Sequence, residues 1–208
     1  MKKRFSIKFL TLKAIKRIFF ATLLVTVFSQ IVLADDKNVV KHLLQERFDD
    51  IIAALENKDL DEETKKKRIE DIIKPIFDLP LMSKLALGRA SWTAMAKEDQ
   101  ERFSELFTKI LKQAYFSKIL GYVDENIIIE EPDQVGEKVY IPTFIVSKDQ
   151  KTSVLWKFYQ SDTGWKVYDI EVEGVSFIQT YRSQFTESLQ EMTVKELMVK
   201  MEELISSQ

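Results

Sequence analysis

The sequence predicts an α+β fold in which helices collect against one face of a curved four-stranded antiparallel sheet. Apolar residues recur at helical spacing up to Gly121 and again after Gly174. Between these two parts, four stretches of alternating apolar residues are separated by short polar turns, which is typical of antiparallel neighbours. Because helices and strands are segregated along the chain, a layered α+β domain is the expected architecture.

The expected helices follow from apolar residues spaced three and four apart. They cover residues 39–55, Leu60–Lys74, Leu81–Ala90, Ala96–Gly121, Val175–Leu189 and Thr193–Ser207. Acidic residues in the first turn of the second helix suit its dipole. The fourth and longest helix carries an apolar stripe from Phe103 to Tyr115, which is typical of a core and becomes a pocket lining only if the sheet opposite leaves space.

The expected strands are short and lie close together in the chain. They cover Val123–Glu131, Lys138–Ser147, Ser153–Gln160 and Trp165–Glu173, with the turn Pro132–Gly136 after the first. Pro142 in the second strand indicates an edge or a bulge. In the last strand, Tyr168, Ile170 and Val172 are expected on one apolar face. Gly174 then reverses the backbone toward the next helix.

Residues 1–34 have the composition of a secretory signal peptide. They hold seven Lys or Arg residues and no acidic residue, and the apolar run Ile18–Phe28 precedes a small residue, Ala34. We expect cleavage after Ala34, since this run is short for a membrane span. Residues 35–208 would then form one soluble, exported domain.

Charge and residue content exclude several functions. Removing the seven basic residues of 1–34 from the 31 of the chain leaves 24 against 33 acidic residues, a net charge of −9, which argues against nucleic-acid binding but leaves a local basic patch open. Without cysteine, and with His42 as its one histidine, the chain lacks ligands for a zinc or copper site. No glycine-rich phosphate loop or nucleophile elbow occurs, so an enzyme is not expected.

Two blocks of residues resemble the MlaC family, the toluene-tolerance auxiliary proteins of ABC lipid transporters. One block contains Trp165–Asp169, Glu173–Ser176 and Tyr181–Phe185; the other contains Phe77-Asp78, Leu87-Gly88, Trp92, Gln100–Phe103, Phe107, Leu111 and Tyr115. The resemblance implies a twisted sheet whose helices enclose a deep apolar pocket. It also implies a monomeric periplasmic carrier that holds phospholipid as cargo, without another cofactor. Such a carrier would shuttle lipid between an inner-membrane ABC transporter with its substrate-binding ring and an outer-membrane lipoprotein complex, maintaining outer-membrane lipid asymmetry.

Ten residues are candidates for lining the pocket, with ordinary core packing as the alternative for each. They are Leu111, Tyr115, Phe144, Val154, Trp156, Tyr168, Ile170, Val175, Phe177 and Tyr181. Val175 lies in the matched run at the corner between strand and helix, so Val175→Glu is expected to leave the protein folded and abolish lipid binding. Asp169 is expected to form a structural ion pair with Arg182 rather than to act in acid–base chemistry.

Two other classes of function fit the residues. One is a periplasmic binding module for a different apolar ligand, such as a sterol-like lipid or a solvent, which a larger cavity with a single body would favour. The other is an interaction protein without a ligand, whose apolar faces would fill one another completely. The filling of the space between the sheet and the helices therefore discriminates among the three.

Overall fold

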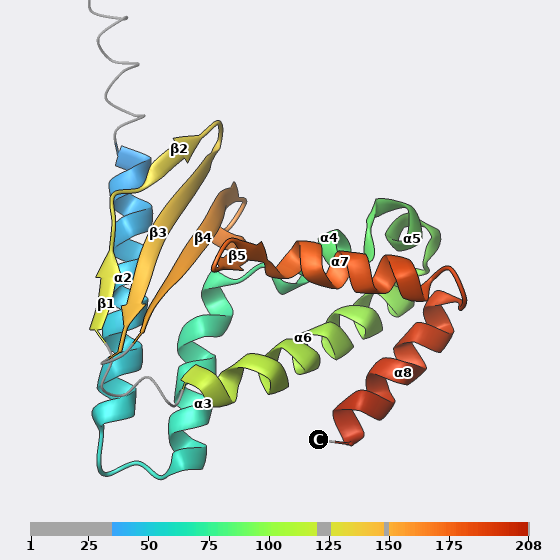
Figure 1. Cartoon of the computed structure of the whole chain (residues 1–208), viewed down its shortest axis with the longest axis horizontal. Coiled ribbons are helices and arrows are strands. Elements are labelled where there is room, and N and C mark those ends of the chain that lie inside the picture. The colour runs from blue at the N-terminus through green and yellow to red at the C-terminus, as the bar shows by residue number, and fades with distance from the viewer. Residues whose placement is uncertain (1–34, 120–125, 148–149, 208) are drawn as a thin grey trace, which may run out of the picture.

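The computed structural model describes residues 35–119, 126–147 and 150–207, with the side chains of 35 and 115–119 left out (Figure 1). The expected signal peptide, residues 1–34, and the start of the first expected strand lie outside these residues. The helices are α2 (Asp35–Glu56), α3 (Glu62–Ile73), the 3-10 turn η1 (Lys74–Ile76), α4 (Leu79–Leu87), α5 (Arg89–Ala94), α6 (Lys97–Ile119), α7 (Phe177–Ser188) and α8 (Val194–Ser206).

Polar caps place the helix starts close to the predicted ones. Asp61 accepts the Thr64 N–H at 2.7 Å and begins α3, and Asp78 accepts the Leu81 N–H at 2.9 Å and begins α4. The prediction of a single helix over Leu81–Ala90 is wrong, because two helices, α4 and α5, cover this segment. Gly88 has a φ of 90°, so α4 ends before it and α5 begins after it.

The strands form one antiparallel sheet in the order β1-β3-β4-β5-β6, with β2 also paired to β3. They are β1 (Asn126–Ile129), β2 (Asp133–Val135), β3 (Lys138–Val146), β4 (Lys151–Ser161), β5 (Gly164–Val172) and β6 (Val175–Ser176). The predicted α+β fold is thus confirmed, and the predicted count of four strands is corrected. Strand β2 forms within the expected turn, while β6 forms because Glu173 and Gly174, with φ of 50° and 76°, make a two-residue hairpin turn.

Pro142 lies inside β3, which has neighbours on both sides, and not on an edge strand. Strand β1 pairs with β3 from Thr143 onward, and β2 pairs with it up to Tyr140. Pro142 therefore lies opposite the link between β1 and β2, where neither strand pairs with β3. A residue without an N–H is tolerated at this position because no strand there needs its hydrogen bond.

A β-bulge divides strand β5 and decides which side chains face which way. Lys157 pairs with Asp169, but Phe158 pairs with Val167, so Tyr168 is an extra residue. The bulge turns Val167 and Ile170 to the same face and Tyr168 to the other. The expected grouping of Tyr168 with Ile170 is therefore wrong, because it assumed strict alternation through this point.

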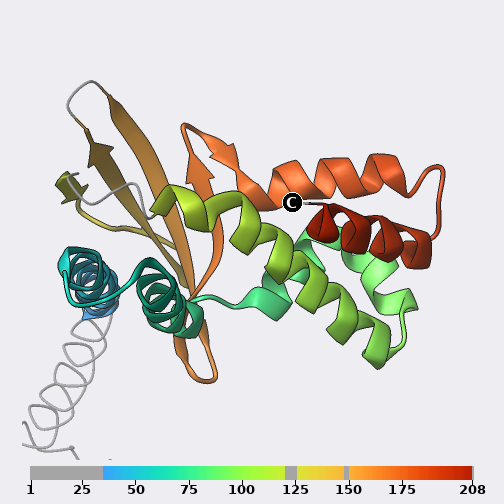
Figure 2. The ribbon, with the colours of Figure 1, turned by 90° about the horizontal axis from the view of Figure 1, so that it is seen from below.

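The helices form two groups rather than one layer on the sheet. Helix α2 packs across one sheet face, with α3 beside it, while α4 to α8 gather beyond the end of the sheet (Figures 1 and 2). The second group has its own filled core, in which Phe103, Phe107 and Phe185 are buried together with α8 methionines. Helix α6 runs from this core back toward α3, as Figure 2 shows.

Candidate functional site

A cavity of about 430 Å³ lies between α2, α3 and α6 on one side and a face of the sheet on the other. Of its 24 lining residues, 18 are apolar. The apolar residues come from α2 (Leu44, Phe48, Ile51, Ile52, Leu55), from the segment 73–82 (Ile73, Ile76, Phe77, Leu79, Met82), from α6 and α7 (Leu111, Phe177) and from the sheet (Ile127, Ile145, Val154, Trp156, Ile170, Val172). An apolar cavity of this kind suits the apolar part of a ligand.

Five of the ten candidate residues line this cavity: Leu111, Val154, Trp156, Ile170 and Phe177. They come from α6, β4, β5 and the start of α7, so the fold brings together positions far apart in the chain. That they contact a ligand stays a prediction. The side chain of Tyr115 lies outside the part of the chain that the structure describes.

Phe144, Tyr168 and Tyr181 lie elsewhere. On β3 the residues Ile141 and Ile145 face the same side as the cavity, so alternation puts Phe144 on the opposite face, where the Lys151 Nζ is 3.7 Å from its ring centroid. Tyr168 is turned away by the bulge. The Tyr181 ring packs edge to face on Phe107, 5.0 Å between centroids, in the filled helical core.

Val175 continues the cavity side of the sheet at its edge. It pairs with Val172, which lines the cavity, and paired residues of antiparallel strands point to the same face. However, Val175 is 58% exposed and is not among the lining residues. Its position is therefore beside the cavity rather than inside it.

Trp156 presents an apolar ring to the cavity because its polar atom is satisfied elsewhere. Its Nε1–H donates to Thr143 Oγ1 at 3.1 Å, and that hydroxyl donates to the Val154 carbonyl at 3.2 Å. The ring meets Phe48 edge to face at 5.5 Å and Phe77 at 6.3 Å. A tryptophan held in this way adds a large apolar surface without an unpaired donor.

Sequence reasoning missed the contribution of α2. Five apolar residues of this helix line the cavity, including the adjacent pair Ile51 and Ile52. Adjacent residues of a helix lie about 100° apart around its axis, so Ile51 and Ile52 make the apolar face of α2 wider than packing against one neighbour requires. The width of this face is the sequence signal that could have predicted the role of α2. Ile127 and Ile145 were also missed, although they alternate toward the same face as Val154.

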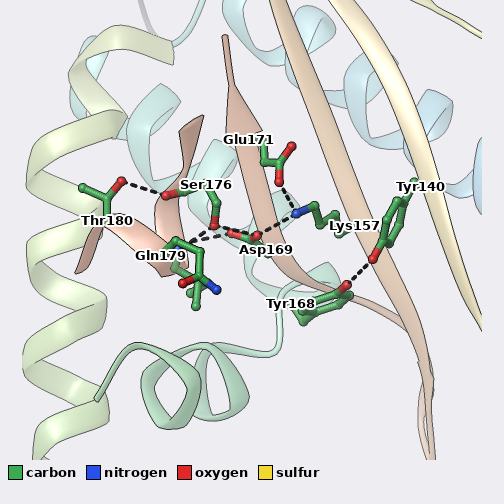
Figure 3. Close-up of polar contacts among 9 residues, drawn as sticks. Tyr140, Lys157, Tyr168, Asp169, Glu171, Ser176, Gln179 and Thr180 are labelled. Carbon is green, nitrogen blue, oxygen red and sulfur yellow. Dashed lines mark hydrogen bonds and ion pairs between the residues drawn. The ribbon is translucent and has the colours of Figure 1, made fainter. Parts of the chain in front are cut away.

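The opposite face of the sheet carries a polar cluster (Figure 3). Lys157 lies between two carboxylates, with its Nζ 3.2 Å from Asp169 Oδ2 and in contact with Glu171. Asp169 is 5% exposed and also accepts the Ser176 hydroxyl at 2.8 Å and the Ile178 N–H at 3.2 Å. This cluster joins β4 and β5 to the start of α7.

Lys157 occupies the place that the sequence analysis gave to Arg182. It is directly paired with Asp169 on the neighbouring strand, and among the described residues no ion pair joins Asp169 to Arg182, which lies beside Gly88. Burial disfavours the charge of Lys157, but hydrogen bonds and attraction from Glu171 and Asp169 outweigh it and raise its pKa. The cluster is an ion-pair network that Asp169 joins to Ser176 and Ile178 at the start of α7. It thereby positions Phe177, the first residue of α7, at the cavity.

Three tyrosine hydroxyls also form hydrogen bonds on this face. The Tyr140 and Tyr168 hydroxyls are 2.9 Å apart, and burial followed by this hydrogen bond raises the pKa of Tyr168. Tyr159 donates to Asp78, and burial together with this bond raises the pKa of Tyr159 to about 12. A phenol with its ordinary pKa of 10.0 is already protonated at neutral pH, and these upward shifts move both groups further from titration there, which favours structural over acid–base roles.

In the described part of the chain, no group of three or more His, Cys, Asp or Glu residues could hold a metal ion. None of the helices described there combines the length and hydropathy that a bilayer span requires.

The fold and cavity together define a class of α+β protein that encloses an apolar pocket between a curved sheet and helices. Residues 45–203 match the sequence model of the MlaC protein family. That match covers well over half of the chain, so this protein belongs to the MlaC family, which confirms the resemblance seen in the sequence.

Two relatives are similar over much of their length. The intermembrane phospholipid transport system binding protein MlaC of Haemophilus influenzae is 23% identical over 138 residues, which span 64% of this chain and 64% of that protein. A phospholipid-binding protein of Ralstonia solanacearum, solved in complex with a phospholipid, has 21% identity and a TM-score of 0.73 over 80% of this chain and 97% of that one. The structural likeness establishes the shared fold.

Proposed function

We propose that this protein is a periplasmic carrier that holds the acyl chains of a phospholipid in its cavity. The observation that carries the proposal is the 430 Å³ cavity with 18 apolar residues among the 24 that line it. The names of the two relatives, one a phospholipid transport protein and the other crystallised with a phospholipid, support the ligand class. An open cavity also speaks against an interaction protein whose apolar faces fill one another.

The energetics of lipid transfer explain why such a carrier is needed. Each methylene hidden from water contributes ~0.8 kcal/mol, so two acyl chains with roughly thirty methylenes have a transfer cost on the order of 20 kcal/mol. A free phospholipid therefore rarely enters water. An apolar cavity that travels with the protein lowers this cost for the part of the chains that it covers.

The proposal extends to location and partners. Residues 1–34 act as a cleaved signal peptide, and residues 35–208 form one monomeric lipid-binding domain in the periplasm. The carrier exchanges lipid with an inner-membrane ABC transporter through its substrate-binding ring and with an outer-membrane lipoprotein complex. In this way it contributes to outer-membrane lipid asymmetry and solvent tolerance, with lipid as cargo and without catalysis.

The test is native mass spectrometry of protein exported with its own leader and purified without detergent, followed by organic extraction. We expect phospholipid, one molecule per chain. The critical variant is Val154→Glu, because Val154 is 7% exposed and lines the cavity. A carboxylate at this position disfavours the binding of acyl chains, since its charge would be buried without a partner. We expect this variant to lose the lipid.

The matched control is Val199→Glu on α8, where the valine is 49% exposed and far from the lining residues. We expect this variant to keep its lipid, with circular dichroism confirming that both variants fold. A wild-type protein that carries no lipid and takes none from vesicles would overturn the proposal. Extraction of a sterol-like lipid or solvent instead would replace phospholipid with another apolar ligand.

A further inference from the structure

One cationic side chain among the cavity-lining residues has an unusual environment. Arg47 lies on α2 between Leu44 and Phe48, and it lines the cavity with them. Its side chain is 29% exposed, yet its Nε is buried and has no hydrogen-bond partner among the described residues. Buried guanidinium donors normally have partners, because an unsatisfied one is costly.

The carboxylates near Arg47 leave this donor unused. Asp50 Oδ2 is 3.4 Å from Nη1, and Glu46 Oε2 is 3.8 Å from Nη2, so both approach only the outer nitrogens. Both carboxylates are themselves about half exposed. Exposed pairs of this kind contribute little. The side chain of Arg47, which lines the cavity, is therefore held only weakly on its outer side and can turn its unpaired Nε–H toward a ligand there.

Other charged groups in the lining make the same wall positive. Lys74, at the end of α3, and Lys112, on α6, also line the cavity, and Glu70 is the one carboxylate among its lining residues. Glu70 is paired with Lys112. The sheet, by contrast, contributes only Thr152 as a polar lining residue. The helical wall therefore offers positive charge inside a protein that is otherwise acidic.

We propose that Arg47 binds the phosphodiester group of the phospholipid whose chains occupy the cavity, an inference that rests on the proposed function. A guanidinium matches the oxygens of a phosphate with its fork of N–H donors. Acyl chains offer no acceptor to Nε, whereas a phosphodiester joined to them offers oxygens at the polar edge of an apolar site. Lys74 and Lys112 add positive potential along the same wall.

This assignment has a specific consequence for selectivity. Every glycerophospholipid with a headgroup alcohol carries the phosphodiester, so the site separates such phospholipids from diacylglycerol but not one headgroup alcohol from another.

The test is competitive loading of the delipidated protein from vesicles. The vesicles contain dioleoyl phosphatidylglycerol, dioleoyl phosphatidylcholine and dioleoylglycerol, which share their acyl chains, and bound lipid is counted by mass spectrometry. Wild type should prefer both phospholipids to dioleoylglycerol by about tenfold, the size of one charged hydrogen bond. Arg47→Met should lose this preference and load dioleoylglycerol as wild type does. Arg47→Lys should keep part of it.

Arg102→Met is the matched control, because Arg102 pairs with Glu202 outside the cavity lining. It should keep the full preference. Inorganic phosphate titrated onto the delipidated protein distinguishes a lipid phosphate from a free anion. Phosphate binding that Arg47→Met abolishes, in a wild type that shows no preference for phospholipid over dioleoylglycerol, would assign the site to a free anion and overturn the lipid assignment. Equal loading of all three lipids by wild type would overturn the role of Arg47 alone, whereas failure of all three to load would overturn the carrier proposal itself.

Discussion

Helix α6 contributes to two apolar regions that differ in how they are filled. Near its start, Phe103 and Phe107 are buried in the core of the second helix group, where Phe185 packs 5.5 Å from Phe103 and 5.9 Å from Phe107. Farther along, Leu111 lines the cavity beside the sheet. The apolar pattern of the helix is the same in both regions. The two regions differ in what packs against them. Helices α7 and α8 cover the first region, whereas a cavity lies between the second region and the sheet.

The largest expected effect comes from truncating the filled region. Phe107→Ala removes a ring buried among Phe103, Tyr181 and Phe185 and should cost about 4 kcal/mol of unfolding free energy, because the cavity it leaves cannot collapse fully. Leu111→Ala, measured by the same urea titration, should cost about 1 kcal/mol or less, since its side chain already borders open space. Equal losses would mean that the two regions are packed alike.

A second prediction concerns the polar face behind the cavity. Lys157→Met leaves Asp169 and Glu171 without their shared cation and should lower the unfolding free energy by about 3 kcal/mol. The double variant Lys157→Met with Asp169→Asn should recover part of that loss, because it removes one stranded charge. A single variant as stable as wild type would show that the network is dispensable for holding α7.

The variant Val175→Glu tests how far the lipid-binding part of the cavity extends toward the edge of the sheet. Since Val175 faces the cavity side but is largely exposed, the carboxylate should reduce lipid loading less than Val154→Glu does. Lipid per chain, counted by native mass spectrometry in the two variants, checks this order. Complete loss in Val175→Glu, as the sequence alone suggested, would extend the functional cavity to the β5–β6 hairpin.

The smallest expected effect is on pH dependence. The pKa of Tyr159 is raised in the folded protein to about 12, from an ordinary value of 10.0, so its hydrogen bond to Asp78 stabilises the fold fully below pH 10. That contribution should disappear as the pH rises from 10 to 12. Thermal melting of wild type and Tyr159→Phe across this range should show a shallower decline in the variant. Parallel curves would contradict the assignment.

The sequence predicted the elements well and the facing of single residues less well. Helical spacing and the acidic residues of its first turn locate α3 because these signals are local. Tyr168 was placed on the wrong face because a bulge is set by pairing with β4, which alternation cannot reveal. For Phe144, both faces of β3 read as apolar, so only the packing of α2 against the sheet determines which face borders the cavity.

The same limit applies to the cavity itself. Val154, Trp156 and Ile170 line the cavity from one face of the sheet, but nothing in their pattern distinguishes a filled space from an open one. That distinction depends on where α6 lies relative to α2 and α3. Arg47 could have been suspected from its position between Leu44 and Phe48, although a single basic residue in an amphipathic helix is usually a solvated one.

The most direct test of the central claim uses the tryptophans of the two regions. Trp156 lines the cavity, while Trp92 packs edge to face on Phe103 in the filled core, 6.3 Å between ring centroids. Two single-tryptophan variants, one retaining Trp156 and the other Trp92, with Trp165 replaced in both, would be loaded with a phospholipid brominated along its acyl chains, because bromine quenches indole fluorescence on contact. We expect strong quenching of Trp156 and little of Trp92. Unquenched Trp156 in a protein shown to carry the lipid would place the acyl chains elsewhere and contradict the account.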